Sequence, residues 1–383
     1  MYMKQDFFNI ALVVKTDGLE YDDRIRKEIL SAQRLAKVKF KIFVMLKDNV
    51  ELDGLTSYGV PYHSVYIPAR EKYSSASHTL LKSWQFYKVI KKEVEKFDAV
   101  WCADIGTELT AMFLKNKRML FDCHEIPTHL IGSRIGRILC KLLFKKCRII
   151  LHANPQRIDY LESIGMIQNK TKHVALRNYP DNSTDIIIES NIWSEFEEWV
   201  VNRKCVYLQG LVENSRASYE SVAAILGTPG LSAVVIGKYD SASLEKLKVE
   251  FGKELDDRVF FTGKIPQESI IQYVRKCFFS MIFYKNIRPN NWYCEANRFY
   301  LAASSGLPVI TGNNPPMRSV VEKYHLGISI DDDGGCLKTI KDAITVLLAN
   351  YDQYSESAKK ASSEFSWVTQ DDLIKEIVED LLK

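Results

Sequence analysis

The feature that most constrains the fold is a rhythm of short apolar runs and helical stretches that stops near residue 180 and then starts again. In the first half the apolar runs lie at 9–14, 41–46, 64–68, 99–103, 118–123, 148–153 and 173–178. In the second half they lie at 205–210, 232–237, 258–263, 278–283, 307–312 and 326–331. Strands alternating with helices predict a parallel sheet covered on both faces. We therefore expect an α/β chain of two Rossmann-like, doubly wound domains that face each other across a ligand-binding cleft.

The domain boundaries follow from the same pattern. A polar stretch at 180–191 is the best linker candidate, and 383 residues suit two cores better than one. We predict an N-terminal domain over 1–185 and a C-terminal domain over 195–353. A helical segment over 354–383 closes the chain.

Composition narrows the class of protein. A content of 46% hydrophobic and 26% charged residues is that of a soluble globular chain. No apolar run reaches the roughly 20 residues that span a bilayer, and the start lacks a signal-peptide cleavage site. The eight cysteines form no C-x-x-C pair, which favours buried free thiols. These observations predict a cytoplasmic protein, and we expect no nucleic-acid partner.

Positive charge is concentrated in the first half, where residues 1–190 hold 30 Lys and Arg against 22 Asp and Glu. Within the segment 134–148 the basic residues recur at helical spacing, with apolar residues between them. Such a helix can lie on an anionic membrane surface, which would make the protein peripheral at a membrane. The interpretation that we favour is a domain helix with its apolar face on the sheet and its charges in water. The basic residues are Arg134, Arg137, Lys141, Lys145 and Arg148, and the apolar residues are Ile135, Ile138, Leu139, Leu142 and Leu143.

Four segments carry motifs at the ends of the expected strands and helices. They are D-D-R-I-R-K-E at 22–28, F-D-C-H-E at 121–125, R-N-Y-P at 177–180, and N-R-F at 297–299 followed by S-G-L-P-V-I at 305–310. In this order and spacing they resemble the retaining glycosyltransferase family four group of bacterial polysaccharide enzymes, which have the GT-B fold. The resemblance covers nearly the whole chain.

The resemblance implies a glycosyltransferase that moves a sugar from a nucleotide-sugar donor to a glycan or lipid-linked acceptor in bacterial surface polysaccharide assembly. It implies a donor held mainly by the C-terminal domain, an acceptor held by the N-terminal domain, and a retaining reaction. It also implies no metal and no cofactor beyond the donor itself. With the late Phe365 and Trp367, it predicts that the 354–383 helix packs back on the N-terminal domain.

His124 is the first candidate catalytic residue, because the family places a histidine beside the transferred sugar at this position. An imidazole there can hydrogen-bond a sugar hydroxyl or stabilise charge. Asp122 and Glu125 flank it in the same motif and are the other catalytic candidates. We expect the loop to be exposed, so that replacing His124 leaves the fold intact.

The donor-binding candidates lie mainly in the second half. Gln209 and Gly210 end a strand, and Arg216 follows in a loop where a guanidinium suits a forked phosphate contact. Lys238 and Lys264 follow strand-ending glycines. Gly18, in the loop after the first strand, is a further phosphate candidate through its backbone N–H. The remaining candidates are Glu295, Asn297 and Arg298, near the start of an expected helix.

One departure concerns the donor ribose. The family carries a second glutamate that holds the ribose, and Leu301 occupies that position here. Glu295 is the nearest carboxylate. Leu301 therefore leaves open a non-catalytic nucleotide-sugar-binding partner subunit. A second rival, which the GT-B resemblance leaves open, is a GT-B nucleotide-sugar epimerase.

Overall fold

The computed structural model describes residues 7–74, 77–167, 171–181 and 187–383. The chain divides into two compact units, Met1–Arg177 with Gln370–Lys383, and Asn178–Thr369. The division at 177/178 falls ahead of the expected boundary at 185–195. The expected linker at 180–191 includes residues 182–186, which lie outside the described residues.

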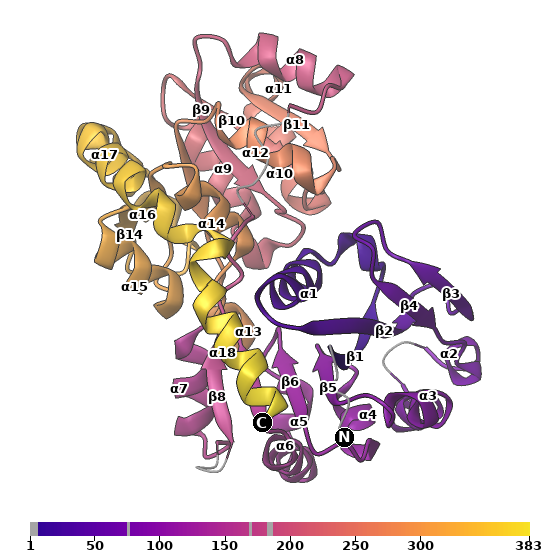
Figure 1. Ribbon diagram of the computed structural model, residues 1–383. Coiled ribbons are helices and arrows are strands. Elements are labelled where there is room, and N and C mark those ends of the chain that lie inside the picture. Colours follow the sequence, from indigo (N-terminus) through magenta and orange to yellow (C-terminus); the bar gives the residue numbers. More distant parts are fainter. Residues whose placement is uncertain (1–6, 75–76, 168–170, 182–186) are drawn as a thin grey trace. The chain divides into compact units, whose positions relative to one another are not determined.

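The first unit is built on an eight-stranded sheet in the order β3-β4-β2-β1-β5-β6-β7-β8 (Figure 1). All its pairings are parallel except β3 with β4. The central strand β1 pairs with both β2 and β5, and its residues 10–14 are fully buried, as a strand covered on both faces must be. The strands are β1 (Phe8–Thr16), β2 (Val38–Leu46), β3 (Leu52–Leu55), β4 (Pro61–Ser64), β5 (Ala99–Ala103), β6 (Met119–Cys123), β7 (Ile149–His152) and β8 (Lys172–Ala175).

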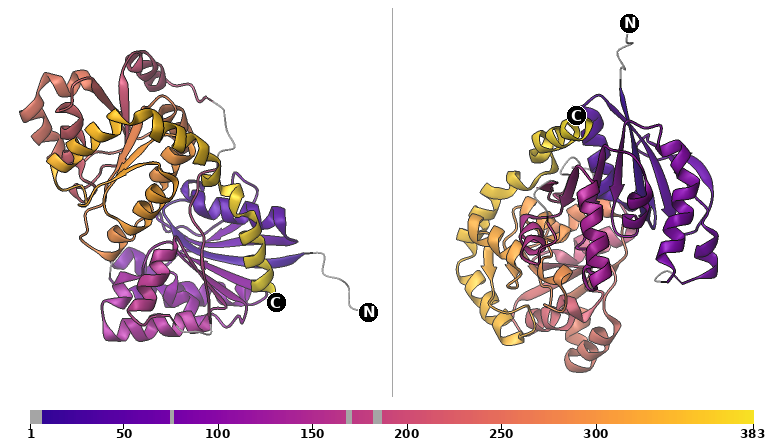
Figure 2. Two further views of the ribbon diagram at one scale, coloured as in Figure 1. Left: turned by 90° about the vertical axis from the view of Figure 1, so that its left-hand side faces the viewer. Right: turned by 90° about the horizontal axis from the view of Figure 1, so that it is seen from below.

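Helices cover both faces of this sheet, as the views of Figure 2 show. Local sequence starts several of them: Ser133 and Asn154 cap α6 and α7 by accepting hydrogen bonds from Gly136 N and Arg157 N. Pro68 opens α2, so the strand expected over 64–68 ends at Ser64 instead. The helical elements are η1 (Leu19–Tyr21), α1 (Asp23–Leu35), α2 (Pro68–Lys72), α3 (Thr79–Val94), α4 (Glu108–Phe113), α5 (Thr128–Ile131), α6 (Arg134–Lys146) and α7 (Pro155–Ser163).

The second unit has a six-stranded, fully parallel sheet in the order β11-β10-β9-β12-β13-β14. Numbered within the unit, this is the order 3-2-1-4-5-6 of a Rossmann sheet. The strands are β9 (Lys204–Gln209), β10 (Leu231–Ile236), β11 (Val259–Gly263), β12 (Phe279–Ile282), β13 (Val309–Thr311) and β14 (Gly327–Ser329). The helical elements are α8 (Asn191–Val200), η2 (Asn214–Arg216), α9 (Ser218–Leu226), α10 (Ser241–Phe251), α11 (Lys253–Arg258), η3 (Gln267–Ser269), α12 (Ile270–Val274), α13 (Pro289–Trp292), α14 (Asn297–Ser304), α15 (Pro315–Tyr324) and α16 (Leu337–Ala349).

The C-terminal segment corrects one expectation. The sequence predicts a single helix over 354–383 on the N-terminal domain, but the structure has two helices, α17 (Tyr351–Ala361) and α18 (Asp371–Leu382), separated by η4 (Ser362–Phe365) and η5 (Trp367–Gln370). The first of these belongs to the second unit, where Ala358 and Ala361 join a buried cluster. Only α18 belongs to the first unit.

Two kinds of contact hold α18 in the first unit. The Gln370 side chain accepts a hydrogen bond from Arg177 N at 2.8 Å and donates one to Arg177 O at 2.7 Å. Beyond it, the helix buries one apolar face beside α1, where Arg34 pairs with Asp371 at 2.7 Å. The side-chain amide of Gln370 thus satisfies both backbone groups of Arg177, as a neighbouring strand would. These two bonds fix the place where the chain rejoins the first unit.

Within the described residues, no helix combines the length and the apolar character that crossing a membrane requires.

Candidate functional site

Each sheet has one point where the strand order reverses, between β1 and β5 in the first unit and between β9 and β12 in the second. Ligands of such sheets bind outside the carboxyl ends of the strands at this point. The loops that follow these strands are therefore where the candidate residues should lie, and each unit is described separately below.

In the first unit, a buried ionic cluster forms between the end of β6 and the helix α1. Arg24 donates to both carboxylate oxygens of Asp122, from Nη2 at 3.0 Å and from Nε at 3.2 Å. Its Nε also lies 2.9 Å from Oε1 of Glu28, one helical turn later. Its Nη1 donates to Leu176 O at 3.0 Å. All three side chains are at most 5% exposed, so the cluster is shielded from water.

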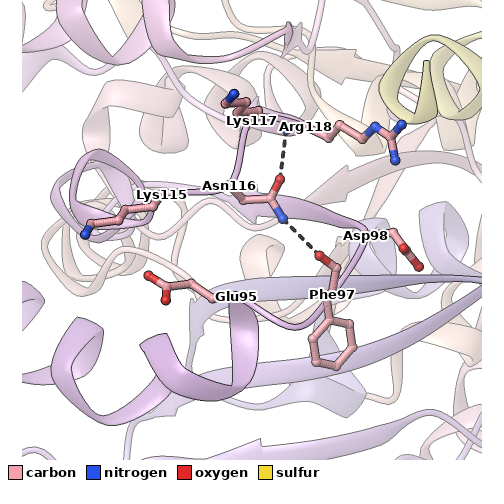
Figure 3. Close-up of a pocket in the computed structure, with 7 residues that line it drawn as sticks. All are labelled: Glu95, Phe97, Asp98, Lys115, Asn116, Lys117 and Arg118. Atoms are coloured by element: carbon pink, nitrogen blue, oxygen red, sulfur yellow. Dashed lines mark hydrogen bonds between the residues drawn. The ribbon is translucent and has the colours of Figure 1, made fainter.

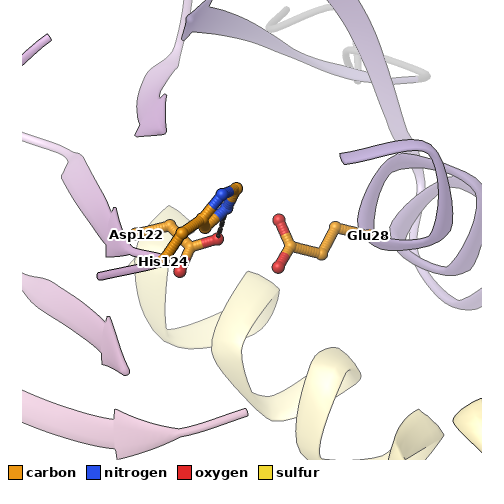
Figure 4. Close-up of side chains that lie close together, drawn as sticks. All are labelled: Glu28, Asp122 and His124. Carbon is orange, nitrogen blue, oxygen red and sulfur yellow. Dashed lines mark hydrogen bonds and ion pairs between the residues drawn. The ribbon is translucent and has the colours of Figure 1, made fainter. Parts of the chain in front are cut away.

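His124 joins this cluster from the loop that follows β6. Its Nε2 lies 2.8 Å from Oδ2 of Asp122, and Figure 4 shows Glu28 pointing toward both residues from α1. Arg157, on α7, donates to the backbone carbonyl of His124. The His124 side chain is only 15% exposed. The expectation of an exposed loop that the fold does not need is therefore wrong for His124, because its ring is part of a buried ion-pair network.

The cluster sets the charge of each of its members. Burial would raise the pKa of the Asp122 carboxyl, but the positive charges of Arg24 and His124 hold it well below its usual range. Burial would lower the pKa of His124, but the charge and hydrogen bond of Asp122 prevail and raise it to about 9. Burial and the neighbouring Asp122 raise the pKa of Glu28 well above its usual value. At neutral pH His124 is therefore a cation.

Asp104 completes the site and is absent from the sequence-based candidates. It follows β5 directly, its backbone N donates to Asp122 O at 3.0 Å, and its Oδ2 lies 3.9 Å from Nδ1 of His124. Its φ of 62° lies in the left-handed region, which is uncommon outside glycine and recurs at functional sites. The signal in the sequence was its place immediately after an apolar run. Arg24 and Glu28 were visible as motif residues without a role.

The side chains of Glu28, Asp122 and His124 are close enough together to bind a metal ion, since one possible ligand atom from each lies within 4.8 Å of the others. However, the guanidinium of Arg24 already lies between the two carboxyl groups. A divalent cation would have to displace a buried cation of the same sign. The carboxyl groups of this cluster therefore already have Arg24 and His124 as their partners.

The other two first-unit candidates lie around the cluster. Glu125 is exposed, one residue beyond His124. Gly18 precedes η1 with an extended backbone, φ −175°, so no left-handed conformation requires a glycine there. Its N–H points to Thr16 Oγ1 at 3.4 Å. Asp22 caps α1 beside them, and burial raises the pKa of its carboxyl.

In the second unit, three glycines line the carboxyl ends of neighbouring strands. Gly210, Gly237 and Gly263 have φ values of +63°, +93° and +64°. Their backbones are linked, because Gly210 N donates to Ile236 O and Gly237 N donates to Gly263 O, both at 2.8 Å. Side chains with a Cβ rarely adopt this conformation. The edge is therefore open backbone where a ligand can approach closely.

Arg216 lies next to this edge, in the loop between β9 and α9. Its Nη1 donates to Gly210 O at 2.6 Å, and its guanidinium lies 5.5 Å from the ring centroid of Tyr284, which follows β12. Arg216 ends the short helix η2, and the next residue, Ala217, has a φ of +51° although it is not a glycine. Arg216 is thus held at the switch point between β9 and β12.

Arg298 is placed differently from the expected donor contact. It is buried, and it donates to the carbonyl oxygens of Gln209 and, at 3.3 Å, of Phe283. Its guanidinium lies 4.9 Å from the ring centroid of Tyr284. These contacts tie the ends of β9 and β12 together. The Gln209 side chain is also engaged, since it accepts a hydrogen bond from the Tyr207 hydroxyl.

The remaining candidates differ in exposure. Lys238 and Lys264 are both exposed, each one residue beyond a glycine of the edge. Asn297 is exposed and accepts a hydrogen bond from Asn178 Nδ2 at 2.9 Å, whereas Glu295 is 8% exposed. Leu301, where the resemblance leads one to expect a ribose-binding glutamate, packs against the apolar core of the unit.

A cavity of about 470 Å³ in the first unit lies elsewhere (Figure 3). Its lining comes from the loops that precede β5 and β6, and therefore from the amino edge of the sheet. Asn116 bridges these loops, accepting from Arg118 N at 2.8 Å and donating to Phe97 O at 3.1 Å. Because ligands of parallel sheets bind at the opposite edge, this cavity is not the site described above.

The fold, but not the sequence, relates this chain to known proteins. No protein-family profile and no curated protein sequence matches it. Sucrose-phosphate synthase from Thermosynechococcus elongatus is similar in structure, with a TM-score of 0.76 and 13% identity over 98% of this chain and 99% of that one. HepE of Anabaena, solved with UDP and glucose, gives 0.73 and 14% over 97% and 99%. Trehalose-6-phosphate synthase OtsA gives 0.66 and 10% over 97% and 98%.

These neighbours are GT-B glycosyltransferases, and they confirm the expected α/β fold of two Rossmann-like domains. At 10–14% identity they establish the fold alone. Membership of glycosyltransferase family four stays a prediction.

Proposed function

We propose that this chain is a glycosyltransferase that takes its sugar from a nucleotide-sugar donor, with a uridine diphosphate sugar as the first candidate. The fold supports the proposal, and two of the similar structures were solved with UDP or with UDP and glucose. The second unit is proposed to bind the donor and the first unit the acceptor.

The chemistry of sugar transfer matches the charges at the second-unit edge. When the bond between the donor's sugar and its diphosphate breaks, the nucleoside diphosphate leaves with additional negative charge. The glycine edge at 210, 237 and 263 presents backbone to such a group, and Arg216, Lys238 and Lys264 supply cations around it. A fixed guanidinium stabilises this charge without reorganising during the reaction.

The observation that carries the proposal is the His124 cation held by Asp122. With Nε2 engaged by Asp122, the Nδ1–H is the atom that can donate to a substrate oxygen or stabilise nearby negative charge. Asp122 is fully buried and bonded to Arg24, so we assign it a positioning role and not direct catalysis. The exposed Glu125 and the half-buried Asp104 are the carboxylates that we propose for contact with an acceptor hydroxyl.

The donor ribose needs a hydrogen-bond partner, since Leu301 offers only apolar surface. We propose Asn297 and Glu295 for this role. Asn297→Ala and Glu295→Gln should each weaken donor binding by about 1–3 kcal/mol, whereas Leu301→Ala should change it less. Titration calorimetry with the donor measures the effect, and unchanged affinity in both polar variants would show that other groups hold the ribose.

The finer features follow the resemblance to family four. We propose a glycan or lipid-linked acceptor of the kind used in bacterial surface polysaccharide assembly, and a reaction that retains the anomeric configuration. Nuclear magnetic resonance of the product at early times measures that configuration directly. An inverted product would refute retention and leave the transfer activity itself in place.

The proposal is tested by incubating the protein with a panel of nucleotide sugars, with and without acceptors, and analysing the products by mass spectrometry. We expect nucleoside diphosphate release that depends on His124, with His124→Gln about 100-fold slower or more. His63→Gln is the matched control, since His63 pairs with Asp53 away from the site. An epimeric nucleotide sugar formed without an acceptor would instead favour an epimerase. Donor binding with no turnover by any acceptor would favour a non-catalytic partner subunit.

A further inference from the structure

The helix α6 in the first unit exposes apolar side chains that its sequence pattern would place against the sheet. The helix is anchored through the other side, where Gly136, Cys140, Leu143 and Phe144 are buried. At Gly136 an added Cβ would lie 2.0 Å from Leu130 O, so this side is in tight contact with α5. Of the apolar residues expected to face the sheet, Leu143 is buried, whereas Ile135, Ile138 and Leu142 are exposed.

Three apolar residues of α6 face solvent instead. Ile135 is 74% exposed, Ile138 59% and Leu142 51%. At about 100° per residue these three side chains fall within an arc of about 60° on the helix. Isolated exposed apolar residues are ordinary, but three in one stripe on one helix are not.

Basic residues border this stripe. Arg134, Lys141 and Lys145 lie within about 40° of one another and directly beside the apolar arc. Arg134 and Lys145 are exposed and Lys141 is half-buried, and none of the three forms an ion pair among the residues that the structure describes. Arg137, in contrast, donates to Ile131 O at 2.8 Å. The positive charge of Arg134, Lys141 and Lys145 is thus uncompensated.

The neighbouring helices extend the surface. Lys146 donates to the carbonyl oxygens of Ala111 and Met112 at 2.9 and 2.6 Å, which ties α6 to the end of α4. On the other side of α4, Phe113 meets the indole of Trp84 edge-on at 5.1 Å between ring centroids. Figure 1 shows α3, α4 and α6 along one side of the unit, and α4 contacts both of the others.

The α3 side of this layer has the same character. Leu80 and Trp84 are 60% and 40% exposed, and Lys88 lies 5.4 Å from the indole centroid of Trp84. Tryptophan beside lysine is typical of membrane–water interfaces, where the ring lies at the headgroup level. We use the term apolar–basic surface for Leu80, Trp84, Lys88, Arg134, Ile135, Ile138, Lys141, Leu142 and Lys145.

We propose that the apolar–basic surface docks on a bilayer that contains anionic lipids. The apolar residues enter the boundary between headgroups and acyl chains, and the basic residues pair with lipid phosphates. Charge favours an anionic bilayer over a second copy of the chain as the partner of this surface. A second copy would bring the same uncompensated cations to the contact. This inference is independent of the sugar-transfer activity proposed above.

The test is flotation of the full chain with two kinds of vesicle. One kind contains phosphatidylcholine alone, and the other also contains about 30% phosphatidylglycerol, so that about one lipid in three is anionic. We expect binding to the anionic vesicles at low salt and loss of binding at high salt or on neutral vesicles. The triple variant Arg134→Gln, Lys141→Gln, Lys145→Gln should bind about 100-fold more weakly. Its charge-matched control replaces the exposed second-unit lysines Lys248, Lys253 and Lys338 by Gln.

The apolar stripe has its own variant and control. Ile135→Ser, Ile138→Ser and Leu142→Ser together should weaken binding about tenfold or more, with an unchanged melting temperature. Replacing Val249, Ile287 and Val346, which are exposed in the second unit, should have no effect. In addition, vesicles with brominated lipid should quench the tryptophan fluorescence of the wild type more strongly than that of the Trp84→Phe variant.

Three results would overturn the proposal. The first is the absence of wild-type flotation with anionic vesicles at low salt. The second is equal loss in the test and control triples, which would reduce the effect to net charge. The third is a dimer in light scattering that the Ser triple abolishes without any vesicle binding, which would assign the surface to a second copy of the chain.

Discussion

Each of the two units has a largely parallel sheet whose strand order reverses once, and the units differ in what they place at the carboxyl edge of that sheet. In the first unit α1 carries Arg24 and Glu28 into a buried contact with Asp122. In the second unit α9 follows the equivalent strand β9, and its buried residues are small or apolar. The hydroxyl of one of them, Ser218, bonds to the backbone carbonyls of Leu211 and Glu213. The second edge relies on glycine backbone and on side chains such as Arg216 from the loops.

The difference shows two ways to prepare a polar site on one architecture. A buried ion-pair network fixes the protonation and position of a single side chain, His124, at a cost in desolvation. An edge of positive-φ glycines presents open backbone and leaves the cations to nearby loops. Perturbing the first edge should therefore affect stability, whereas perturbing the second should affect ligand affinity.

The largest expected effect is on stability in the first unit. Asp122→Asn leaves Arg24 and His124 without their buried counter-charge, so the free energy of unfolding should fall by about 3–5 kcal/mol. Urea denaturation measures it. The control is Asp53→Asn, which removes a surface Asp–His pair and should cost little. Equal losses in the two variants would mean that the network contributes no more than a surface pair.

The second prediction concerns pH. Because the folded-state pKa of His124 is raised to about 9, its contribution is complete below the unfolded value near 6.5 and is lost as the pH rises toward 9. The change amounts to about 3 kcal/mol over this window. Urea midpoints between pH 6 and 10 should fall in the wild type and fall less in His124→Gln. Parallel profiles would remove His124 as the titrating group.

The third prediction concerns ligand affinity at the carboxyl edge of the second unit's sheet. Arg216→Gln should weaken UDP binding by about 1.5–3 kcal/mol, the usual effect of losing a hydrogen bond to a charged group. Its melting temperature should change little. Calorimetry with Arg203→Gln as control measures this, since Arg203 precedes β9 at the amino edge of the sheet. A stability loss without an affinity loss would make Arg216 structural.

The smallest expected effect tests the glycine edge. Gly237→Ala adds a Cβ at φ +93°, where its nearest neighbour, Gly210 N, lies 3.8 Å away, so strain and not collision should cost about 1 kcal/mol. Gly230→Ala, at φ +80° with nothing nearby, is the matched control. We expect similar melting temperatures in the two variants and weaker UDP binding only in Gly237→Ala. Equal affinities would show that the edge does not contact the ligand.

The sequence by itself determined the two-unit α/β fold, because most strands of a parallel sheet are continuous apolar runs bounded by turn residues. It also placed His124 and Gly210 at strand ends and Arg216 in the loop that follows, since a strand's end is a local property of the chain. It missed the exposed antiparallel strand β3, which has no such apolar run.

Only the tertiary structure decided what each of these residues contacts. The bond between Arg24 and Asp122 joins residues 98 positions apart. The Asp122 carboxylate that it holds in place then makes the largely buried His124 a cation. The same holds for α18, which Gln370 returns to the first unit, and for Ile135, Ile138 and Leu142, which the anchoring of α6 turns outward. Spacing along the chain gives a helix its apolar residues, but which of them are covered depends on the surfaces that the rest of the fold brings against it.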